Sequence, residues 1–354
     1  MAAFTLQVAC WNFEDFGWDM SSRSHARLPL FGEVIAEACP DVDVLMVQEA
    51  RQGGYGGGEL VFAAEERLRG LTNDRGFLRA YYFPPVTGQS LLGQVIFLCD
   101  PLLRAQRQYV HGAPDVYHDQ EGFLHARLGD TGHVVKIKSL HWPHWSGDQR
   151  LDAALKLTGH AAPGALTILA GDCNSLWPNC RGHREFEPKW RVRPPHKRFH
   201  KTLPPGLSPG LSPLRPADVV RRLCHWLLRR DPRFRSLSAD RRALRVLAEA
   251  GFRSAGCVAS DMTPTVNAHI DDGQGGRIDH LIVSPALHVV PGSYRVHVSE
   301  RGNRASDHRL VHAEVRIPLP CPLINAPHNP DRPATTTHIT DHGKAPVGEL
   351  LRRR

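Results

Sequence analysis

The sequence lacks any apolar run long enough to cross a bilayer, and no basic and then apolar export signal follows Met1. It also lacks the paired cysteine spacing of a zinc site, although it contains eight cysteines. Several of these, including Cys10, Cys99 and Cys173, lie in predicted strands, which is typical of small buried side chains in a reducing compartment. We therefore expect a cytoplasmic protein without a membrane span.

A further absence concerns the glycine-rich stretch at residues 51–58. No Lys-Ser or Lys-Thr pair follows these glycines, so their match to the phosphate-cradling loop of nucleotide-binding proteins is weak. Residues 59–69 instead have the spacing of an amphipathic helix.

Length and composition are those of an ordinary globular protein. The chain has 354 residues, 41% hydrophobic and 23% charged, which suffices for one large or two ordinary domains. The net charge of +8 is concentrated in residues 179–245, where 18 lysines and arginines face 5 acidic residues. This segment therefore carries +13, and the rest of the chain carries about −5. It is either an arm that binds polyphosphate or a solvated, partly disordered insertion.

The apolar pattern predicts strands and helices in an order that indicates a layered fold. Helical spacing recurs at about 24–38, 59–69, 148–157, 219–230 and 240–250. Apolar or alternating runs predict strands at 4–12, 43–49, 80–83, 93–99, 102–110, 122–128, 133–140, 166–172, 276–285 and after the polar triplet 306–308. Between residues 80 and 140 the strands follow one another without a helix, so we expect antiparallel pairing and a sandwich.

A carboxylate and a carboxamide end the strand at 166–172. If the backbone stays extended, Asp172 and Asn174 point to the same side, so an acceptor and a donor converge where a phosphoester could bind. The alternative is an ordinary turn, because Gly-Asp and Asn-Ser are common turn residues.

Three other strands also end in polar side chains. Asn12 ends the first strand, and Glu49 ends the second. A carboxylate at the end of a buried strand is costly unless it is paired or holds a cation, although Glu49 could also simply leave the edge of the sheet. His141, which aromatic residues follow, could hydrogen-bond a phosphate or protonate a leaving oxygen, or it could be a packed structural histidine.

The strand at 276–285 contains an internal carboxylate, Asp279. A buried charge needs a partner of opposite sign, and a histidine is a natural one. We predict that His308, from the polar triplet 306–308, is this partner.

These polar groups together resemble a known family. Asn12, Gln48-Glu49, His141, Gly-Asp-Cys-Asn at 171–174, Arg-Ile-Asp-His at 277–280 and Ser-Asp-His at 306–308 occur in the order seen in the endonuclease/exonuclease/phosphatase superfamily. Its members include pancreatic-type deoxyribonucleases, abasic-site endonucleases, sphingomyelinases and inositol-polyphosphate phosphatases. The resemblance covers about residues 4–316 without the basic insertion. It implies an α/β four-layered sandwich, in which helices flank two packed mixed β-sheets, with a divalent-metal site at one edge.

The resemblance also implies a domain organisation and a metal site. The catalytic domain would span residues 1–318, with the basic insertion at about 179–245, and residues 319–354 would form a disordered tail. Glu49 resembles the principal magnesium ligand, with Asn12 beside it, and Asp307 resembles an additional carboxylate on the metal side. A sparse shell of carboxylates and carboxamides suits Mg²⁺, with Mn²⁺ as a substitute, better than zinc.

The same resemblance implies roles in catalysis. Asp172 resembles the carboxylate that orients or deprotonates the attacking water, and Asn174 resembles the phosphate-binding amide. Asp279 and His308 resemble the acid-histidine pair that contacts the phosphate. His141 resembles the histidine of the deoxyribonuclease and phosphatase branches, whereas abasic-site endonucleases commonly have tyrosine there.

We therefore expect a monomeric Mg²⁺-dependent phosphoesterase, foremost a nuclease that hydrolyses phosphodiester bonds of nucleic acid. The basic insertion favours a polyanionic substrate. One alternative is a phosphatase or phospholipase that acts on a small or lipid phosphate. Another is an inactive family member that binds nucleic acid or protein.

Overall fold

The computed structural model describes residues 3–19, 22–51, 59–69, 76–85, 92–111, 121–144, 146–178, 240–261, 263–267 and 276–318. All of them belong to one compact unit, Met1–Leu319. The predicted tail, the predicted helix at 219–230 and most of the predicted basic insertion lie outside the described residues, so these predictions stay predictions.

The first β-sheet contains the strands nearest both ends of the described chain. Its order is β11-β13-β1-β2-β4-β3, and β12 also pairs with β13. The strands β1 and β2 are parallel, and the other pairs are antiparallel, so the sheet is mixed. The bounds are β1 Ala3–Asn12, β2 Val44–Arg51, β3 Phe77–Phe83, β4 Leu92–Asp100, β11 His288–Val289, β12 Arg295–Val296 and β13 Val311–Pro318.

The second β-sheet is also mixed and has the order β5-β6-β7-β8-β10-β9. The strands β7 and β8 are parallel, and the other pairs are antiparallel. The bounds are β5 Leu103–His111, β6 Glu121–Leu128, β7 Val134–His141, β8 Thr167–Asp172, β9 Arg253–Ser254 and β10 Asp279–Val283. The antiparallel pairing predicted for the tandem strands is confirmed for β3-β4 and for β5-β6-β7.

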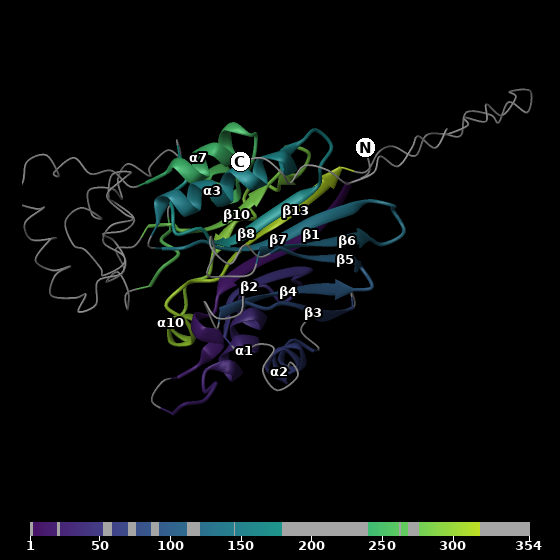
Figure 1. Cartoon of the computed structure of the whole chain (residues 1–354). Coiled ribbons are helices and arrows are strands. Elements are labelled where there is room, and N and C mark those ends of the chain that lie inside the picture. The colour runs from purple at the N-terminus through teal and green to yellow at the C-terminus, as the bar shows by residue number, and fades with distance from the viewer. Residues whose placement is uncertain are drawn as a thin grey trace, which may run out of the picture. The chain divides into compact units, whose positions relative to one another are not determined.

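Helices cover the outer faces of both sheets, which gives four layers (Figure 1). On the first sheet, α1 (Leu28–Ala38) and α2 (Glu59–Leu68) bury apolar side chains such as Phe31 against Val47 and Phe97. On the second, α3 (Gly147–Leu157) and α7 (Arg242–Glu249) pack together over β7, β8 and β10. Short helices complete the fold: η1 (Glu14–Gly17), η3 (Thr158–Ala161), α8 (Ala255–Val258) and α10 (Glu300–Ala305). The predicted four-layered α/β sandwich is confirmed.

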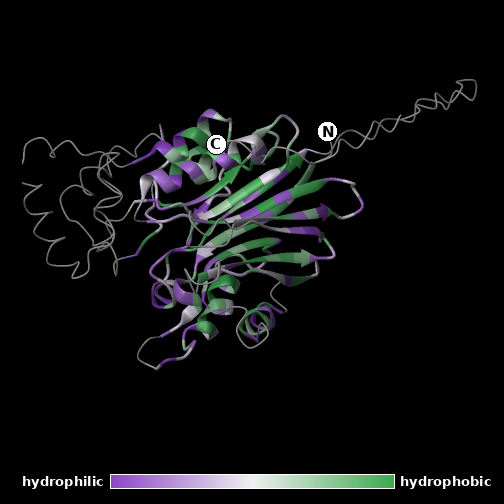
Figure 2. Ribbon diagram, in the orientation of Figure 1, coloured by the Kyte–Doolittle hydropathy of each residue, from purple (hydrophilic) through white to green (hydrophobic). Residues whose placement is uncertain are grey.

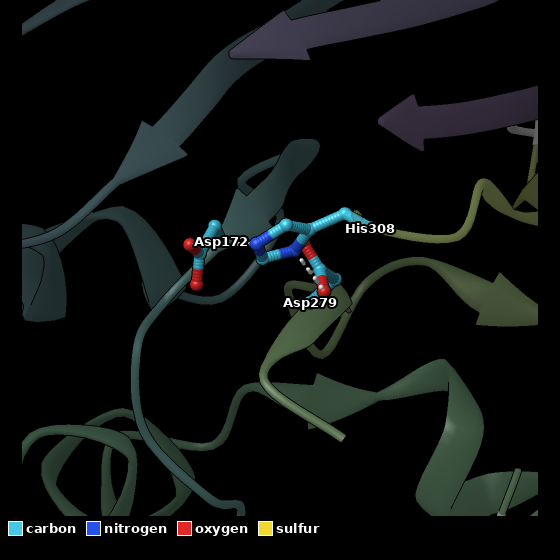
Figure 3. Close-up of side chains that lie close together, drawn as sticks. All are labelled: Asp172, Asp279 and His308. Carbon is cyan, nitrogen blue, oxygen red and sulfur yellow. Dashed lines mark hydrogen bonds and ion pairs between the residues drawn. The ribbon is translucent and has the colours of Figure 1, made fainter. Parts of the chain in front are cut away.

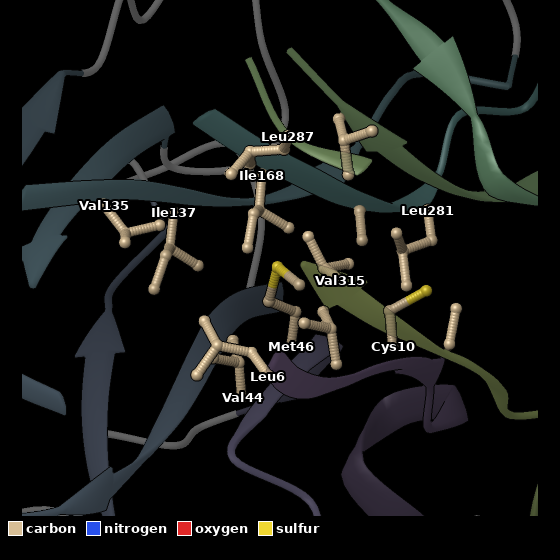
Figure 4. Close-up of a cluster of buried hydrophobic side chains, with 14 of the residues drawn as sticks. Leu6, Cys10, Val44, Met46, Val135, Ile137, Ile168, Leu281, Leu287 and Val315 are labelled. Carbon is tan, nitrogen blue, oxygen red and sulfur yellow. The ribbon is translucent and has the colours of Figure 1, made fainter. Parts of the chain in front are cut away.

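The main core lies between the two sheets. Alternate residues of facing strands interdigitate there, and Figure 4 shows Met46 and Cys10 of the first sheet opposite Ile168 and Leu281 of the second. Figure 2 shows that the strands are mostly hydrophobic, whereas α3 and α7 contain both hydrophobic and hydrophilic residues. Burial of alternating side chains between the two sheets fixes the strand register and makes the sandwich rigid.

The burial predicted for Cys10, Cys99 and Cys173 is confirmed. Cys10, Cys39, Cys99 and Cys173 are buried free thiols. Cys257, however, is disulfide-bonded, which a reducing compartment does not favour, so the expectation of reduced cysteines does not extend to it. None of the helices in the described ranges is long and apolar enough to cross a membrane.

The two sheets approach each other closely at Gly171 in β8. This residue has φ +141°, and a side chain there would overlap the carbonyl oxygen of Leu140 and come within 2.8 Å of Nε2 of Gln48. Gln48 in turn donates to Oγ of Ser139 on β7 at 2.7 Å, so a hydrogen bond joins the sheets beneath the ends of β2 and β8. Only glycine fits this approach.

We predict that Gly171→Ala lowers the free energy of unfolding by about 3 kcal/mol or more, because overlap with backbone adds to the unfavourable φ. The measurement is urea denaturation at 25 °C. Gly164→Ala is the matched control: φ is +80°, but an added Cβ would meet nothing within 4 Å, so it should cost only about 1 kcal/mol. Equal losses in the two variants would show that the close approach is unimportant.

Candidate active site

Four of the predicted residues lie where parallel strands end. Asn12 ends β1, Glu49 lies near the end of β2, His141 ends β7 and Asp172 ends β8. Because parallel strands leave a sheet at the same edge, each sheet delivers two polar side chains to one end of the sandwich.

Short contacts link these four side chains across the two sheets. Nδ2 of Asn12 donates to Oε1 of Glu49 at 3.0 Å and approaches Oδ2 of Asp172 at 3.5 Å. Nε2 of His141 lies 3.4 Å from the same Oε1 of Glu49. The structure therefore brings together residues from four strands that the sequence separates by up to 160 positions.

The backbone turns Glu49 towards this group. Glu49 has φ +59° and lies in an irregularity of the β2-β4 pairing between Val47 and Ala50. Its Oε2 accepts a hydrogen bond from the backbone N–H of Asp15 at 3.1 Å. Arg51 holds Asp15 through a 3.0 Å ion pair. Sequence reasoning missed Asp15, since a backbone donor in a short turn leaves no side-chain signal.

Asn12 provides a test of whether a cation fits. Its side chain is 1% exposed, and its Oδ1 has no hydrogen-bond partner among the described residues, although its Nδ2 donates to two carboxylates. A buried carbonyl oxygen without a partner is costly, and a cation bound to Oδ1 would satisfy it. The neighbouring carboxylate of Glu49 supplies the negative charge that such a cation needs, so the residues fit a hard divalent metal.

Asp172 and Asn174 converge, but not as predicted. The expectation of extended backbone is wrong, because β8 ends at Asp172 and Asn174 has φ +46°. The two are joined by a turn instead: the backbone N–H of Asn174 donates to Oδ1 of Asp172 at 2.8 Å, and Nδ2 donates to Oδ2 at 3.0 Å. Nδ2 also donates to the carbonyl oxygen of Trp142 at 2.8 Å, which ties this turn to the end of β7.

A buried acid-histidine pair lies on the other side of Asp172 (Figure 3). Nδ1 of His308 is 2.9 Å from Oδ2 of Asp279, the pairing that the sequence predicts. Nε2 of His308 lies 3.8 Å from Asp172 and 3.9 Å from Asp307. Asp279 is the first residue of β10 and not internal to a strand as expected, because Arg277 precedes it outside the sheet.

The charge of His308 follows from these neighbours. Burial alone would lower its pKa, but the carboxylates of Asp279, Asp307 and Asp172 outweigh burial and raise the pKa to about 10. Burial also raises the pKa of Asp279, against the opposing effect of His308. We place the shared proton on the imidazole, since three carboxylates surround it.

Oxygen or nitrogen atoms of Asp172, Asp279 and His308 lie within 4.8 Å of one another, as in a metal site. However, a protonated imidazole has no lone pair to offer a metal. With the imidazole protonated, the three residues form an ion-pair network.

Two hydroxyl side chains hold the pair in place: Thr265, which the sequence did not indicate, and Ser306 of the predicted triplet 306–308. Oγ1 of Thr265 accepts the backbone N–H groups of Ile278 and Asp279, each at 3.1 Å. Oγ of Ser306 donates to the carbonyl oxygen of Asn12 at 2.6 Å, which fixes the triplet 306–308 against β1. A threonine outside the predicted strands and helices, such as Thr265, does not by itself indicate a role in a site.

A buried arginine supports the loops after β7 and β8. Arg150 on α3 is 1% exposed, and its Nη1 donates to the carbonyl oxygens of Pro143 at 2.9 Å and His144 at 3.3 Å. Its Nη2 lies 3.9 Å from Oδ2 of Asp240. The Asp240 carbonyl accepts from Oγ of Ser175 at 2.8 Å. Burial lowers the pKa of Arg150 to about 10, and the Asp240 carboxylate opposes this shift.

All eight residues predicted from the sequence thus belong to one connected group. Asn12, Glu49, His141, Asp172, Asn174, Asp279 and His308 are linked by the contacts above, and Asp307 joins through His308. None of the eight lies apart from the rest.

No protein-family model and no curated protein matches the chain. Its fold nevertheless recurs in solved structures. An endonuclease/exonuclease/phosphatase family protein from Bacteroides thetaiotaomicron is 15% identical over 90% of this chain and 97% of its own, with a TM-score of 0.53. ANGEL2, a 2′,3′-cyclic phosphatase solved with adenosine-2′,3′-vanadate, is 14% identical over 89% of this chain and 96% of its own, with a TM-score of 0.54.

A third solved structure, the mannosyl-6-phosphatase of Bacteroides thetaiotaomicron, is 15% identical over 88% of this chain and 99% of its own, with a TM-score of 0.50. At these identities the likenesses show the fold. They confirm that this chain has the fold of the endonuclease/exonuclease/phosphatase superfamily, as the resemblance of its sequence implies.

We predict that His308 in the metal-free protein stays protonated until about pH 10, because three carboxylates surround it. Its folded pKa lies above the unfolded value of about 6.5. The stability from this pair is therefore fully present below about pH 6.5 and is lost as pH rises through 10. NMR titration of the imidazole and urea denaturation at several pH values measure both effects. His308→Gln, which cannot titrate, should lack this alkaline loss; an imidazole that deprotonates below pH 7 would contradict the charge assignment.

We predict that Arg150→Met lowers the free energy of unfolding by roughly 3 kcal/mol, because it leaves two carbonyl oxygens without their donor and removes one of the two cations beside Asp240, which keeps Arg242 at 2.9 Å. Equilibrium urea denaturation checks this value. The control is Arg301→Met, which removes an exposed arginine paired with Glu33 and Glu37 and should cost no more than about 1 kcal/mol. A loss at position 150 as small as that of the control would rule out its anchoring role.

Proposed function

We propose that the protein is a divalent-metal-dependent phosphoesterase that hydrolyses phosphodiester bonds of nucleic acid. The observation that carries this proposal is that Asn12, whose buried Oδ1 has no hydrogen-bond partner among the described residues, and His308 both approach Oδ2 of Asp172. A phosphodiester needs positive charge on both its nonbridging and its leaving oxygens during in-line attack, and it needs a base beside the attacking water.

Glu49, Asn12 and Asp307 are the residues that would hold the metal through oxygen atoms. Oxygen ligands favour Mg²⁺, with Mn²⁺ as a substitute. When bound, the ion would supply Lewis-acid stabilisation of charge on the phosphoryl group. Asp15 and Arg51 would maintain the orientation of Glu49 through the contacts described above.

Asp172 would orient and deprotonate the attacking water. Its Oδ1 and Oδ2 both accept hydrogen bonds from Asn174, which fixes the carboxylate in one orientation. Because Nδ2 of Asn174 already donates to Asp172 and Trp142, Asn174 serves first to position Asp172. It can contact a phosphate only when one of these hydrogen bonds is exchanged.

The two histidines would act on the phosphoryl group. Nε2 of His308 lies beyond hydrogen-bonding distance of Asp172 and Asp307, so neither carboxylate accepts its N–H. His308 would therefore donate to a nonbridging oxygen, with Asp279 holding the ring through Nδ1. His141, beside Glu49, would protonate the leaving oxygen.

Nucleic acid is the substrate that the charge distribution favours. The segment 179–245 carries +13, and a polyanion would be attracted to it. Two of the similar structures have other activities in their names, since ANGEL2 is a 2′,3′-cyclic phosphatase and one of the two Bacteroides thetaiotaomicron proteins is a mannosyl-6-phosphatase. A phosphatase or phospholipase activity on a small or lipid phosphate is therefore the second candidate.

We predict that the protein hydrolyses single-stranded DNA, plasmid DNA or RNA in Mg²⁺ and not in EDTA, whereas inositol phosphates and sphingomyelin stay intact. Asp172→Asn and His308→Gln should each lower the rate roughly 10²- to 10⁴-fold, since they remove the base and the cation. Asp130→Asn, an exposed carboxylate in a turn, is the control and should keep full activity.

Metal binding has a readout independent of turnover. Mg²⁺ or Mn²⁺ should raise the melting temperature of the wild type and of Asp130→Asn, but not of Glu49→Gln. Turnover of lipid or inositol phosphates alone would favour the second candidate. Absence of any metal-dependent hydrolysis by the folded wild type would overturn the enzyme proposal.

A further inference from the structure

The outer face of β5, β6 and β7 contains a row of cationic and titratable side chains. In the register of this sheet, Arg107 lies opposite His125, and His125 lies opposite Lys136. Directly opposed residues point to the same face of a sheet. Their neighbours Leu124 and Ile137 pack between the two sheets, so the row faces outward. Arg107 is exposed, and His125 and Lys136 are partly exposed.

Aromatic rings lie beside this row. Tyr109 is two residues from Arg107 on β5, and its ring centroid is 4.6 Å from that of His125. Nη1 of Arg107 donates to the Tyr109 hydroxyl at 2.8 Å, with the guanidinium 5.3 Å from the ring centroid. On the same face, the ring of His160 of η3 packs with its centroid 4.2 Å from that of Phe123, which lies opposite Tyr109. Cations and rings therefore alternate across three strands.

The electrostatic field on this face is positive. Burial lowers the pKa of His125, and Lys136 and Arg107 lower it further. Burial also lowers the pKa of His160, and Lys136, His125 and Lys138 add to this effect. The positive charge of this face comes from Arg107 and Lys136, and it favours a bound anion.

We propose that this face, formed by Arg107, Tyr109, His125, Lys136 and His160, binds a segment of single-stranded nucleic acid. The strands are about 4.8 Å apart, so Arg107 and Lys136 are separated by roughly 10 Å and contact different phosphates of one strand. The rings of Tyr109 and His125 offer π-faces for an unpaired base. Cationic side chains with interspersed aromatic rings are the usual means of binding single strands, whereas a duplex keeps its bases stacked inside.

This surface is distinct from the proposed active site. Lys136 and His141 lie on the same strand, five residues apart, which corresponds to about 17 Å. A strand held on the outer face can therefore reach the edge where Asp172 lies. Binding on this face requires no hydrolysis, so it is measured in EDTA and does not depend on the proposed function.

Fluorescence anisotropy with a labelled thymidine oligonucleotide, in EDTA and at several salt concentrations, tests the proposal on the full-length protein. Tyr109→Leu should weaken binding roughly tenfold, because a base loses its stacking partner. The double variant Arg107→Ala/Lys136→Ala should lower the slope of log affinity against log salt by about 1.4, as expected for two lost phosphate contacts. Arg104→Ala is the matched control, since it removes the same charge from the same strand but from an ion pair with Asp100.

One measurement locates the binding even if the basic segment 179–245 contributes affinity. Photo-crosslinking of a 4-thiothymidine oligonucleotide, followed by mass spectrometry, should attach it to peptides within 103–111 or 121–128.

Hydrolysis of a small activated phosphodiester should stay unchanged in these variants. Crosslinks confined to 179–245, or equal loss of binding in Arg104→Ala, would overturn the assignment. Competition by inorganic polyphosphate as effective as that by an oligonucleotide of equal charge would also overturn it, since the rings would then contribute nothing.

Discussion

The buried ion pair between His308 and Asp279 is the interaction on which the site depends. Burying either charge alone would cost much free energy. The pair is tolerated because the two side chains are 2.9 Å apart and the backbone N–H of Asp279 donates to Thr265. Asp172 and Asp307 add negative charge around the imidazole and keep it cationic. Since His308 precedes β13 of the first sheet and Asp279 begins β10 of the second, the pair also ties the two sheets together at this edge.

Departures from regular backbone gather around the same edge. Asp15, Glu49 and Asn174 all have positive φ, which costs about 1–2 kcal/mol for a residue with a side chain. Each departure turns a polar group towards the site: Asp15 donates to Glu49, and Asn174 donates to Asp172. The apolar core between the sheets supplies the stability and rigidity that allow such strain to persist.

The parts that sequence predicts are those with a local cause. Apolar periodicity located the strands, because alternate residues of a strand face the core and this alternation is visible in the sequence itself. The need of a buried carboxylate for a cation was enough to pair Asp279 with His308. Asn174 could not be placed correctly, since its left-handed backbone is set by contacts with Asp172 and Trp142. Arg150 has the sequence signature of any helical arginine, and only tertiary packing makes it a buried anchor.

The residues of the site carry more negative than positive charge, so an anion that binds there requires positive charge from elsewhere. Glu49, Asp172, Asp279 and Asp307 bring four carboxylates together, and His308 is the cation that offsets part of their charge. A phosphodiester anion that approaches such a group is repelled unless a metal neutralises the carboxylates. Under the proposed function, positive charge on the face of β5 to β7 would attract the same anion at a distance from Asp172. Separating attraction from chemistry in this way would let Asp172 stay ionised beside a negatively charged substrate, as the proposed function requires.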